Sequence, residues 1–105
     1  MNHQDYVTRR SDRDPEFRRE LAIATAELKL ATAIAERRMA TGIALSDLAM
    51  TTGISEERLV AIEDGDAITV SEILAITHVL HLTIDIGPDF RLSAAPAAQA
   101  ALKMA

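Results

Sequence analysis

Residues 42–65 have the sequence GIALSDLAMTTGISEERLVAIEDG, and this stretch decides the fold. The segments 45–51 and 55–64 carry apolar residues at helical spacing, and a glycine follows closely after each of them. This pattern predicts two short helices that each bury one face. Gly53 allows the tight turn between them, and Ser55 is the predicted N-cap of the second helix. We therefore expect two short helices that cross at a steep angle.

An amphipathic helix is predicted ahead of this stretch, over residues 14–41. Asp14 is its predicted N-cap, and Pro15 suits the first helical position. Apolar residues spaced by three and four positions indicate a buried stripe, which comprises Phe17, Leu21, Ala24, Leu28, Ala31 and Ala35 and is widened by Ile23, Leu30 and Ile34. The stripe favours a helix that packs on the core or on a second copy. The pattern fits one long helix or two helices divided near residues 29–32.

A closing helix is predicted over residues 69–81, because Thr69-Val70-Ser71-Glu72 forms a capping-box sequence. The next five residues, Leu82-Thr83-Ile84-Asp85-Ile86, alternate between apolar and polar and favour a strand within residues 82–92. A single strand needs a partner, which we expect from a second copy or from another protein. A short fifth helix that starts at Thr83 is the alternative.

The chain has 105 residues, enough for one modest core, so a single domain over residues 14–92 is expected. Residues 1–13 are polar and are interpreted as a flexible arm, made basic by Arg9, Arg10 and Arg13. Residues 93–105 are rich in alanine and are interpreted as a mobile tail.

Composition excludes several classes of protein. The chain has no cysteine, which rules out disulfides and thiolate zinc sites. No segment reaches the roughly 18 continuous apolar residues of a membrane span, and no hydrophobic signal segment starts the chain, so we expect a cytoplasmic protein. The net charge is −5, and residues 42–84 hold seven acidic residues against one basic residue, Arg58. A protein that coats nucleic acid without specificity needs the opposite balance.

The motif between Arg38 and Leu82 resembles the XRE (lambda-repressor-like) helix-turn-helix family. The resemblance rests on the spacing of small and apolar residues in 42–65 and on the apolar run Val70, Ile73, Leu74, Ile76, Thr77 and Leu80. It implies a mainly all-α bundle of the lambda-repressor type, here with an extra N-terminal amphipathic helix and a short C-terminal strand. It further implies a homodimer that docks its second short helix in the major groove of operator DNA.

The resemblance also implies site residues. The positions that would contact DNA are Ser46, Ser55, Glu56, Glu57, Arg58 and Ala61. The family commonly has polar residues at the positions of Ala44 and Leu45, and this chain has none there. Glu56 and Glu57 fit two interpretations equally, a solvated helix start or a pair that reads cytosine. Phosphate contacts would come from Arg58, from helix N-termini and from the arm, which could equally be a solvated run of charge.

One implied contact is structural. In the family an arginine near the end of the first helix often pairs with the glutamate before the turn, and these positions hold Arg38 and Glu63. A partly buried carboxylate needs a charge partner, so this ion pair is expected to stabilise the fold.

The flanks are similar to those of HigA-type antitoxins of bacterial toxin-antitoxin pairs. Such proteins bind a RelE-like (HigB-like) toxin and repress their own operon. By that resemblance the first helix is the partner-binding element, with Phe17, Leu21 and Leu28 as apolar anchors and Arg18 and Arg19 on the rim. Removal of residues 1–30 is expected to abolish toxin binding and to leave a folded remainder.

The expected function is therefore an antitoxin-like, DNA-binding autorepressor. The alternatives are a plain transcriptional regulator without a toxin and a helix-turn-helix-derived protein-binding module that has lost DNA binding. His3, His78 and His81 lack the geometry of a metal-ligand set, so no metal is expected. No nucleophile and base stand together, so neither enzymatic activity nor a cofactor is expected.

Overall fold

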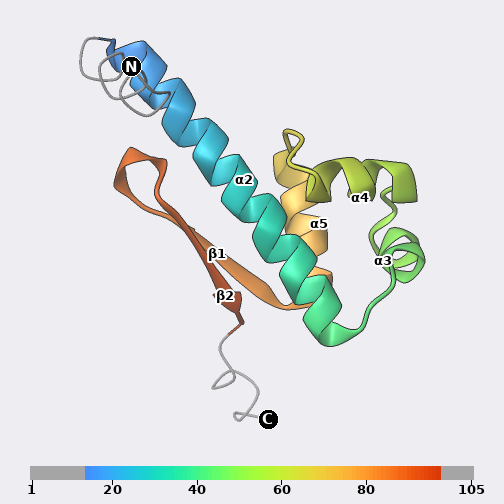
Figure 1. Ribbon diagram of the computed structural model, residues 1–105. Helices are drawn as coiled ribbons and strands as arrows, with labels where there is room; N and C mark the ends of the chain where they lie inside the picture. Colours follow the sequence, from blue (N-terminus) through green and yellow to red (C-terminus); the bar gives the residue numbers. More distant parts are fainter. Residues whose placement is uncertain (1–13, 98–105) are drawn as a thin grey trace.

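The computed structural model describes residues 14–97 and is mainly helical, with one small antiparallel sheet (Figure 1). The described elements follow the order α2 (Pro15–Thr41), α3 (Leu45–Thr52), α4 (Glu56–Glu63), α5 (Val70–Leu80), β1 (Leu82–Ile86), the 3-10 turn η1 (Pro88–Phe90) and β2 (Leu92–Pro96). The predicted arm, residues 1–13, lies outside the described residues, as does most of the predicted tail.

Helix α2 is a single helix of 27 residues that passes through residues 29–32 without a break. Its start is fixed by Asp14, whose Oδ1 accepts hydrogen bonds from the backbone N–H groups of Glu16 and Phe17, each at 3.1 Å. Its end is fixed by Gly42, which has a left-handed φ of 74° and donates its N–H to the carbonyls of Arg38 and Met39. Glycine adopts that conformation without steric cost, so the helix stops there.

Helix α2 lies between the hairpin and the three short helices (Figure 1). The buried residues of α2 are Leu30, Ala31 and Ile34, which belong to its second half. The predicted stripe, with the residues that widen it, was therefore confirmed in part: Leu30, Ala31 and Ile34 are buried, but Leu21, Ile23, Ala24 and Leu28 are exposed, Leu28 at 59%. Alanines lie on two opposite sides of this helix, so the sequence does not single out which edge of the widened stripe is buried, and the core uses the edge that holds Leu30 and Ile34.

The three short helices begin and end close to the predicted positions. Ser55 caps α4 by accepting a hydrogen bond from the Arg58 N–H at 3.1 Å, and Thr69 caps α5 in the predicted capping box with Glu72. Gly53 has a φ of 78° between α3 and α4. One core joins α2, α3, α4, α5 and the hairpin, and its buried members are Leu30, Ile34, Leu48, Leu59, Ile62, Ile76, Leu80, Leu82 and Leu92.

The predicted strand is present, but the prediction of its partner was wrong. β1 pairs with β2 of the same chain, with Ile84 opposite Ala94 and Ile86 opposite Leu92. β2 lies largely in the segment that was predicted to be a mobile tail. The short turn at Pro88–Phe90 lets the chain fold back, and the small residues of β2 allow the hairpin to lie against α2. The alternative fifth helix from Thr83 is excluded.

Over residues 14–97 the structure contains no helix that is both long and apolar enough to cross a membrane.

Candidate binding surfaces

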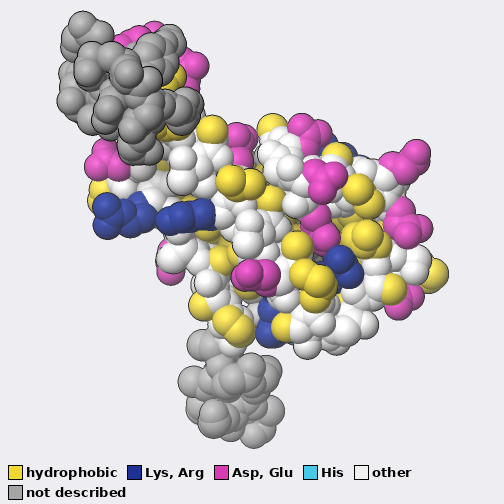
Figure 2. All heavy atoms as spheres, viewed as in Figure 1, with side chains coloured by type: hydrophobic (Ala, Val, Ile, Leu, Met, Phe, Trp, Pro, Cys, Tyr) yellow, Lys and Arg dark blue, Asp and Glu magenta, His cyan; other side chains and the backbone are white. Residues whose placement is uncertain are grey.

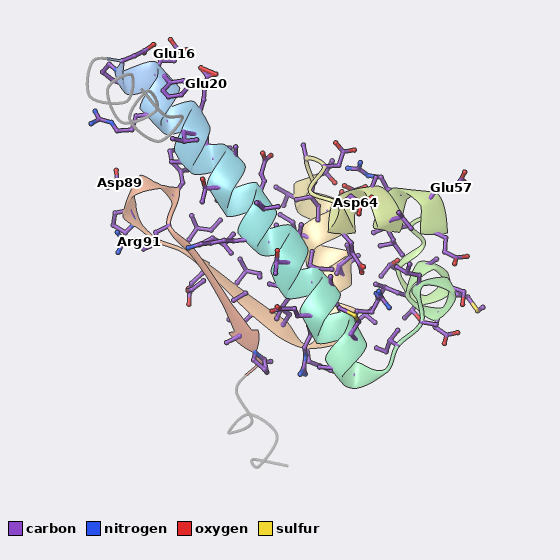
Figure 3. All side chains as sticks on the ribbon, in the orientation of Figure 1. Glu16, Glu20, Glu57, Asp64, Asp89 and Arg91 are labelled. Atoms are coloured by element: carbon purple, nitrogen blue, oxygen red, sulfur yellow. The ribbon has the colours of Figure 1, made fainter. Side chains whose placement is uncertain are left out.

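The outer face of α4 carries most of the residues that the resemblance assigned to DNA. Ser55, Glu56 and Glu57 are exposed, and Ala61 is half-buried. Ser46 is exposed on the neighbouring helix α3, whose N-cap is Ala44 and has no side-chain capping bond. Figure 3 shows Glu57 on α4 directed away from α2. Four of these residues, Ser46, Ser55, Glu56 and Glu57, are thus exposed to solvent.

The structure brings Arg38 and Glu63 together. Arg38 Nε donates to Glu63 Oε2 at 2.7 Å, Nη2 donates to Oε1 at 3.1 Å, and Nη1 donates to the carbonyl of Ile43 at 3.1 Å. The side chains are only 16% and 12% exposed, and the hydrogen bond with Glu63 raises the pKa of Arg38. This bidentate pair fastens the end of α4 to the end of α2.

The sequence suggested a free Arg58 on the α4 surface, but the structure shows Arg58 in ion pairs. Its Nε and Nη2 donate to the two carboxylate oxygens of Glu72 at 2.8 and 2.9 Å, its Nη1 donates to Asp66 Oδ2 at 3.1 Å, and Nη2 also donates to the carbonyl of Ala67 at 2.6 Å. The guanidinium has five N–H groups, so nearly all of its donor capacity is used. Arg58 therefore ties α4 to the loop and helix that follow.

Glu72 shows the electrostatic result of this contact. Hydrogen bonds from Arg58 and from the Thr69 backbone N–H lower the pKa of Glu72 from 4.5 to about 2. The same contact raises the pKa of Arg58. Arg58 is consequently part of a local ion-pair network, and its charge is already neutralised there.

The surface around α4 is acidic. Asp47, Glu56, Glu57 and Asp64 are exposed, and none has an ion-pair partner within residues 14–97. Figure 2 shows acidic side chains gathered over the α3–α5 side of the molecule in this view. The one basic side chain of α4 is Arg58, which is already paired. A phosphate backbone placed along α4 would thus meet carboxylates and helix N-termini.

The first half of α2 carries the residues predicted to bind a partner. Leu21 and Leu28 are exposed, as is Ile23, while Arg18 is exposed and Phe17 is half-buried. The core uses residues 30, 31 and 34, so these apolar side chains are not needed to hold the helices together. Burial of such groups against another protein is favourable. The half-helix therefore presents an apolar surface to solvent.

A groove, which we name the α2–loop groove, lies between this half-helix and the hairpin loop. Two adjoining hollows of about 700 and 330 Å³ form it. Its lining holds four basic residues, Arg18, Arg19, Lys29 and Arg91, with Asp89 as the one acidic residue and an apolar floor that includes Ala22 and Phe90. Figure 3 shows Asp89 and Arg91 at the hairpin loop on this side of α2.

Sequence reasoning found Arg18 but missed Lys29, Phe90 and Arg91 as members of one surface. The hairpin brings residues 88–92 back beside residues 15–29, and no local sequence pattern predicts this contact. The positions of Arg18, Ala22 and Lys29 on one helical face were readable from the sequence, because residues three and four apart share a face. Their counterpart on the loop required the strand partner to be known.

Within residues 14–97 no group of three or more His, Asp or Glu side chains is arranged to hold a metal ion. His78 is exposed in the last turn of α5, and His81 forms its left-handed C-cap with a φ of 52°.

The chain has no significant match among protein-family models, curated proteins or solved structures.

Proposed function

We propose that this chain is a helix-turn-helix regulator of the antitoxin type, which contacts operator DNA through α4 and a partner protein through the first half of α2. The observation that carries the proposal is the solvent-facing position of α4, which the Gly53 turn and the Arg38–Glu63 pair hold at a fixed angle to α2. A helix that enters the major groove must be exposed along its outer face and rigidly supported.

The DNA contact rests on base edges and helix N-termini more than on side-chain cations. Glu56 and Glu57 are exposed at the first turn of α4 and can accept hydrogen bonds from cytosine N4 in the major groove. The N–H groups at the starts of α3 and α4 can donate to phosphate oxygens. The family resemblance gives the arrangement on DNA, a homodimer on a palindromic operator.

The partner contact rests on exposed apolar side chains. Leu21 and Leu28 lie seven residues apart on one face of a half-helix that the core does not use, and a partner that covers them removes apolar surface from water. In the proposed function that partner is a RelE-like toxin.

A second candidate function is a protein-binding module with the same architecture that does not bind DNA. Two observations favour it: Arg58 is bound by Glu72 and Asp66, and the remaining exposed charges on this face are acidic. Carboxylates near phosphates weaken association, so a face of this charge suits a cationic partner.

A DNA-binding titration separates the two functions. The probe is the promoter fragment upstream of the chain's own gene, with a fragment of unrelated sequence as control. An operator-binding protein should bind the promoter fragment more tightly, and its affinity should fall steeply as salt rises. Equal, weak binding to both fragments would support the protein-binding module.

Co-expression with the neighbouring gene tests the partner contact. The neighbouring product should co-purify with the wild-type chain, and Leu21→Ser together with Leu28→Ser should release it. Val70→Ser is a matched control, since Val70 is an apolar residue that is 71% exposed on α5. Co-purification unaffected by the α2 changes would place the contact elsewhere.

A further inference from the structure

We infer that the α2–loop groove binds an acidic polypeptide segment of a partner protein, with carboxylates of the segment on the groove's cations and an apolar side chain of the segment on its floor. This inference deepens the proposed function and rests on its claim that the first half of α2 has a protein partner. It adds the hairpin loop as the second wall of the site and specifies the charge of the partner.

The charged side chains that line the α2–loop groove are mainly basic. Arg18, Arg19, Lys29 and Arg91 are all exposed, and none of them has an ion-pair partner within residues 14–97. By contrast, Arg38 and Arg58 are both neutralised by ion pairs elsewhere in the described residues. Asp89 is the one acid among the lining residues. In a chain with a net charge of −5, this groove is therefore a local basic region.

The shape and floor of the groove carry the second step. Ala22 and Ala26 are small, so α2 leaves a hollow beneath the loop, and Phe90 lines both parts of that hollow while remaining 41% exposed. A hollow with an aromatic wall and a basic rim fits an apolar side chain flanked by carboxylates.

The backbone of the hairpin loop adopts an uncommon conformation at the groove. Asp89 and Phe90 both have a φ of 59°, a left-handed conformation that is uncommon for a bulky aromatic residue. The bond from the Gly87 N–H to the Arg91 carbonyl, at 2.7 Å, closes the loop around them. Such conformations cluster where a protein presents a side chain to a ligand. Here the loop holds Phe90 and Arg91 at the groove.

The same features favour a polypeptide over nucleic acid. Nucleic-acid grooves track a phosphate backbone with many cations, whereas this one holds four cations, one carboxylate and an apolar floor. Exposed acids also stand nearby on α2, at Glu16 and Glu20 (Figure 3). Discrete carboxylates on a short segment can avoid them, and a continuous phosphate chain is repelled by them.

The test uses the full chain labelled with ¹⁵N and a labelled peptide of about 16 residues in which Glu and Leu form opposite faces of a helix. A peptide of equal length with Lys in place of Glu, and a single-stranded oligonucleotide, are the comparison probes. The Glu peptide should shift the amide signals of residues 15–29 and 88–92. Raised salt should lower the affinity of this peptide. The Lys peptide should leave these signals in place.

Two variants test the two parts of the site. Arg91→Ala should lower the affinity for the Glu peptide about threefold, as expected for an exposed charge contact. Met50→Glu changes the net charge by the same amount on α3, where Met50 is 82% exposed, and should leave the affinity unchanged. Phe90→Asn keeps a residue that tolerates the left-handed conformation and removes the ring, so it should also weaken binding.

Several results would overturn the inference. These are signal changes confined to α3 and α4, preferential binding of the oligonucleotide, equal loss of affinity in Met50→Glu and Arg91→Ala, and concentration-dependent self-association that Arg91→Ala abolishes. The last result would mean that a second copy of this chain occupies the groove.

The two proposals fail in different ways. If a co-purifying partner depends on Leu28, which does not line the groove, and is indifferent to Arg91→Ala and Phe90→Asn, the partner function stands and the groove assignment falls. If the Glu peptide binds the groove and no partner or promoter fragment is bound, the groove assignment stands and the proposed function falls.

Discussion

Arg38 and Glu63 are 25 residues apart in the chain and are joined by two hydrogen bonds, at 2.7 and 3.1 Å, with little exposure of either side chain. The pair connects the last turn of α2 to the last residue of α4. Because the first helix of the domain thereby sets the position of α4, loss of the pair affects stability and the α4 surface together.

Removal of one member of the Arg38–Glu63 pair should lower the stability of the fold. Glu63→Ala leaves the Arg38 guanidinium partly buried without its carboxylate, and should lower the free energy of unfolding by about 2 kcal/mol. Urea denaturation measures the change. Glu36→Ala removes an exposed carboxylate from α2 and is the matched control. Identical denaturation midpoints for Glu63→Ala and wild type would refute a stabilising role for the pair.

The Arg58–Glu72 contact predicts a specific dependence on pH. The pKa of Glu72 is about 2 in the folded chain and 4.5 without its contacts, so the unfolded chain takes up a proton first as the pH falls. The stability that this carboxylate contributes is complete above pH 4.5 and is lost between that value and pH 2. The stability difference between wild type and Glu72→Gln should shrink across this window. A difference independent of pH would contradict the assignment.

How far the sequence predicted the structure depends on how local each signal is. The caps at Asp14, Ser55 and Thr69 and the turn at Gly53 involve residues within a few positions of each other, and the structure has them where the sequence predicted them. The stripe on α2 and the partner of β1 depend on which distant segment packs where. An alanine-rich helix and an alanine-rich strand provide too little contrast to specify that.

The same reasoning explains one incorrect expectation about an exposed cation and one about the buried face of α2. Arg58 looked free because its partners, Asp66 and Glu72, are 8 and 14 residues away. Phe17, Leu21 and Leu28 belong to the predicted buried stripe, but the buried residues of α2 begin at Leu30. Leu30 is 4% exposed, so removal of residues 1–30 would take one buried residue from the core and should lower the stability of the remainder.

The boundary between the core half and the exposed half of α2 can be measured. Ile34 is fully buried, so Ile34→Ala should lower the free energy of unfolding by about 3 kcal/mol through lost burial and a residual cavity. Leu28→Ala should change it by less than about 1 kcal/mol, because that side chain is 59% exposed in the single chain. Equal losses in the two variants would mean that Leu28 belongs to the core.

The turn between α3 and α4 depends on its glycine. Gly53 has a φ of 78°, and a Cβ there would meet no atom within 4 Å, so the cost of a side chain is conformational and not steric crowding. Gly53→Ala should cost about 1 kcal/mol, and Gly53→Asn should cost less because asparagine tolerates this conformation. Thermal denaturation of the two variants gives the order, and an alanine variant as stable as wild type would contradict the argument.

The acidic start of α4 offers the sharpest test of how this surface works. Glu57 is exposed and has no ion pair within residues 14–97, so Glu57→Ala should leave the fold intact. If Glu57 accepts a hydrogen bond from a base, the variant should bind the promoter fragment about tenfold more weakly, within the usual range for one base contact. Arg58→Ala should instead lower stability, because Arg58 holds Glu72 and Asp66. Met50→Ala, on exposed α3 surface, is the control for a neutral change. Tighter DNA binding by Glu57→Ala would mean that the carboxylate only repels phosphate, and the base-reading role of α4 would be refuted.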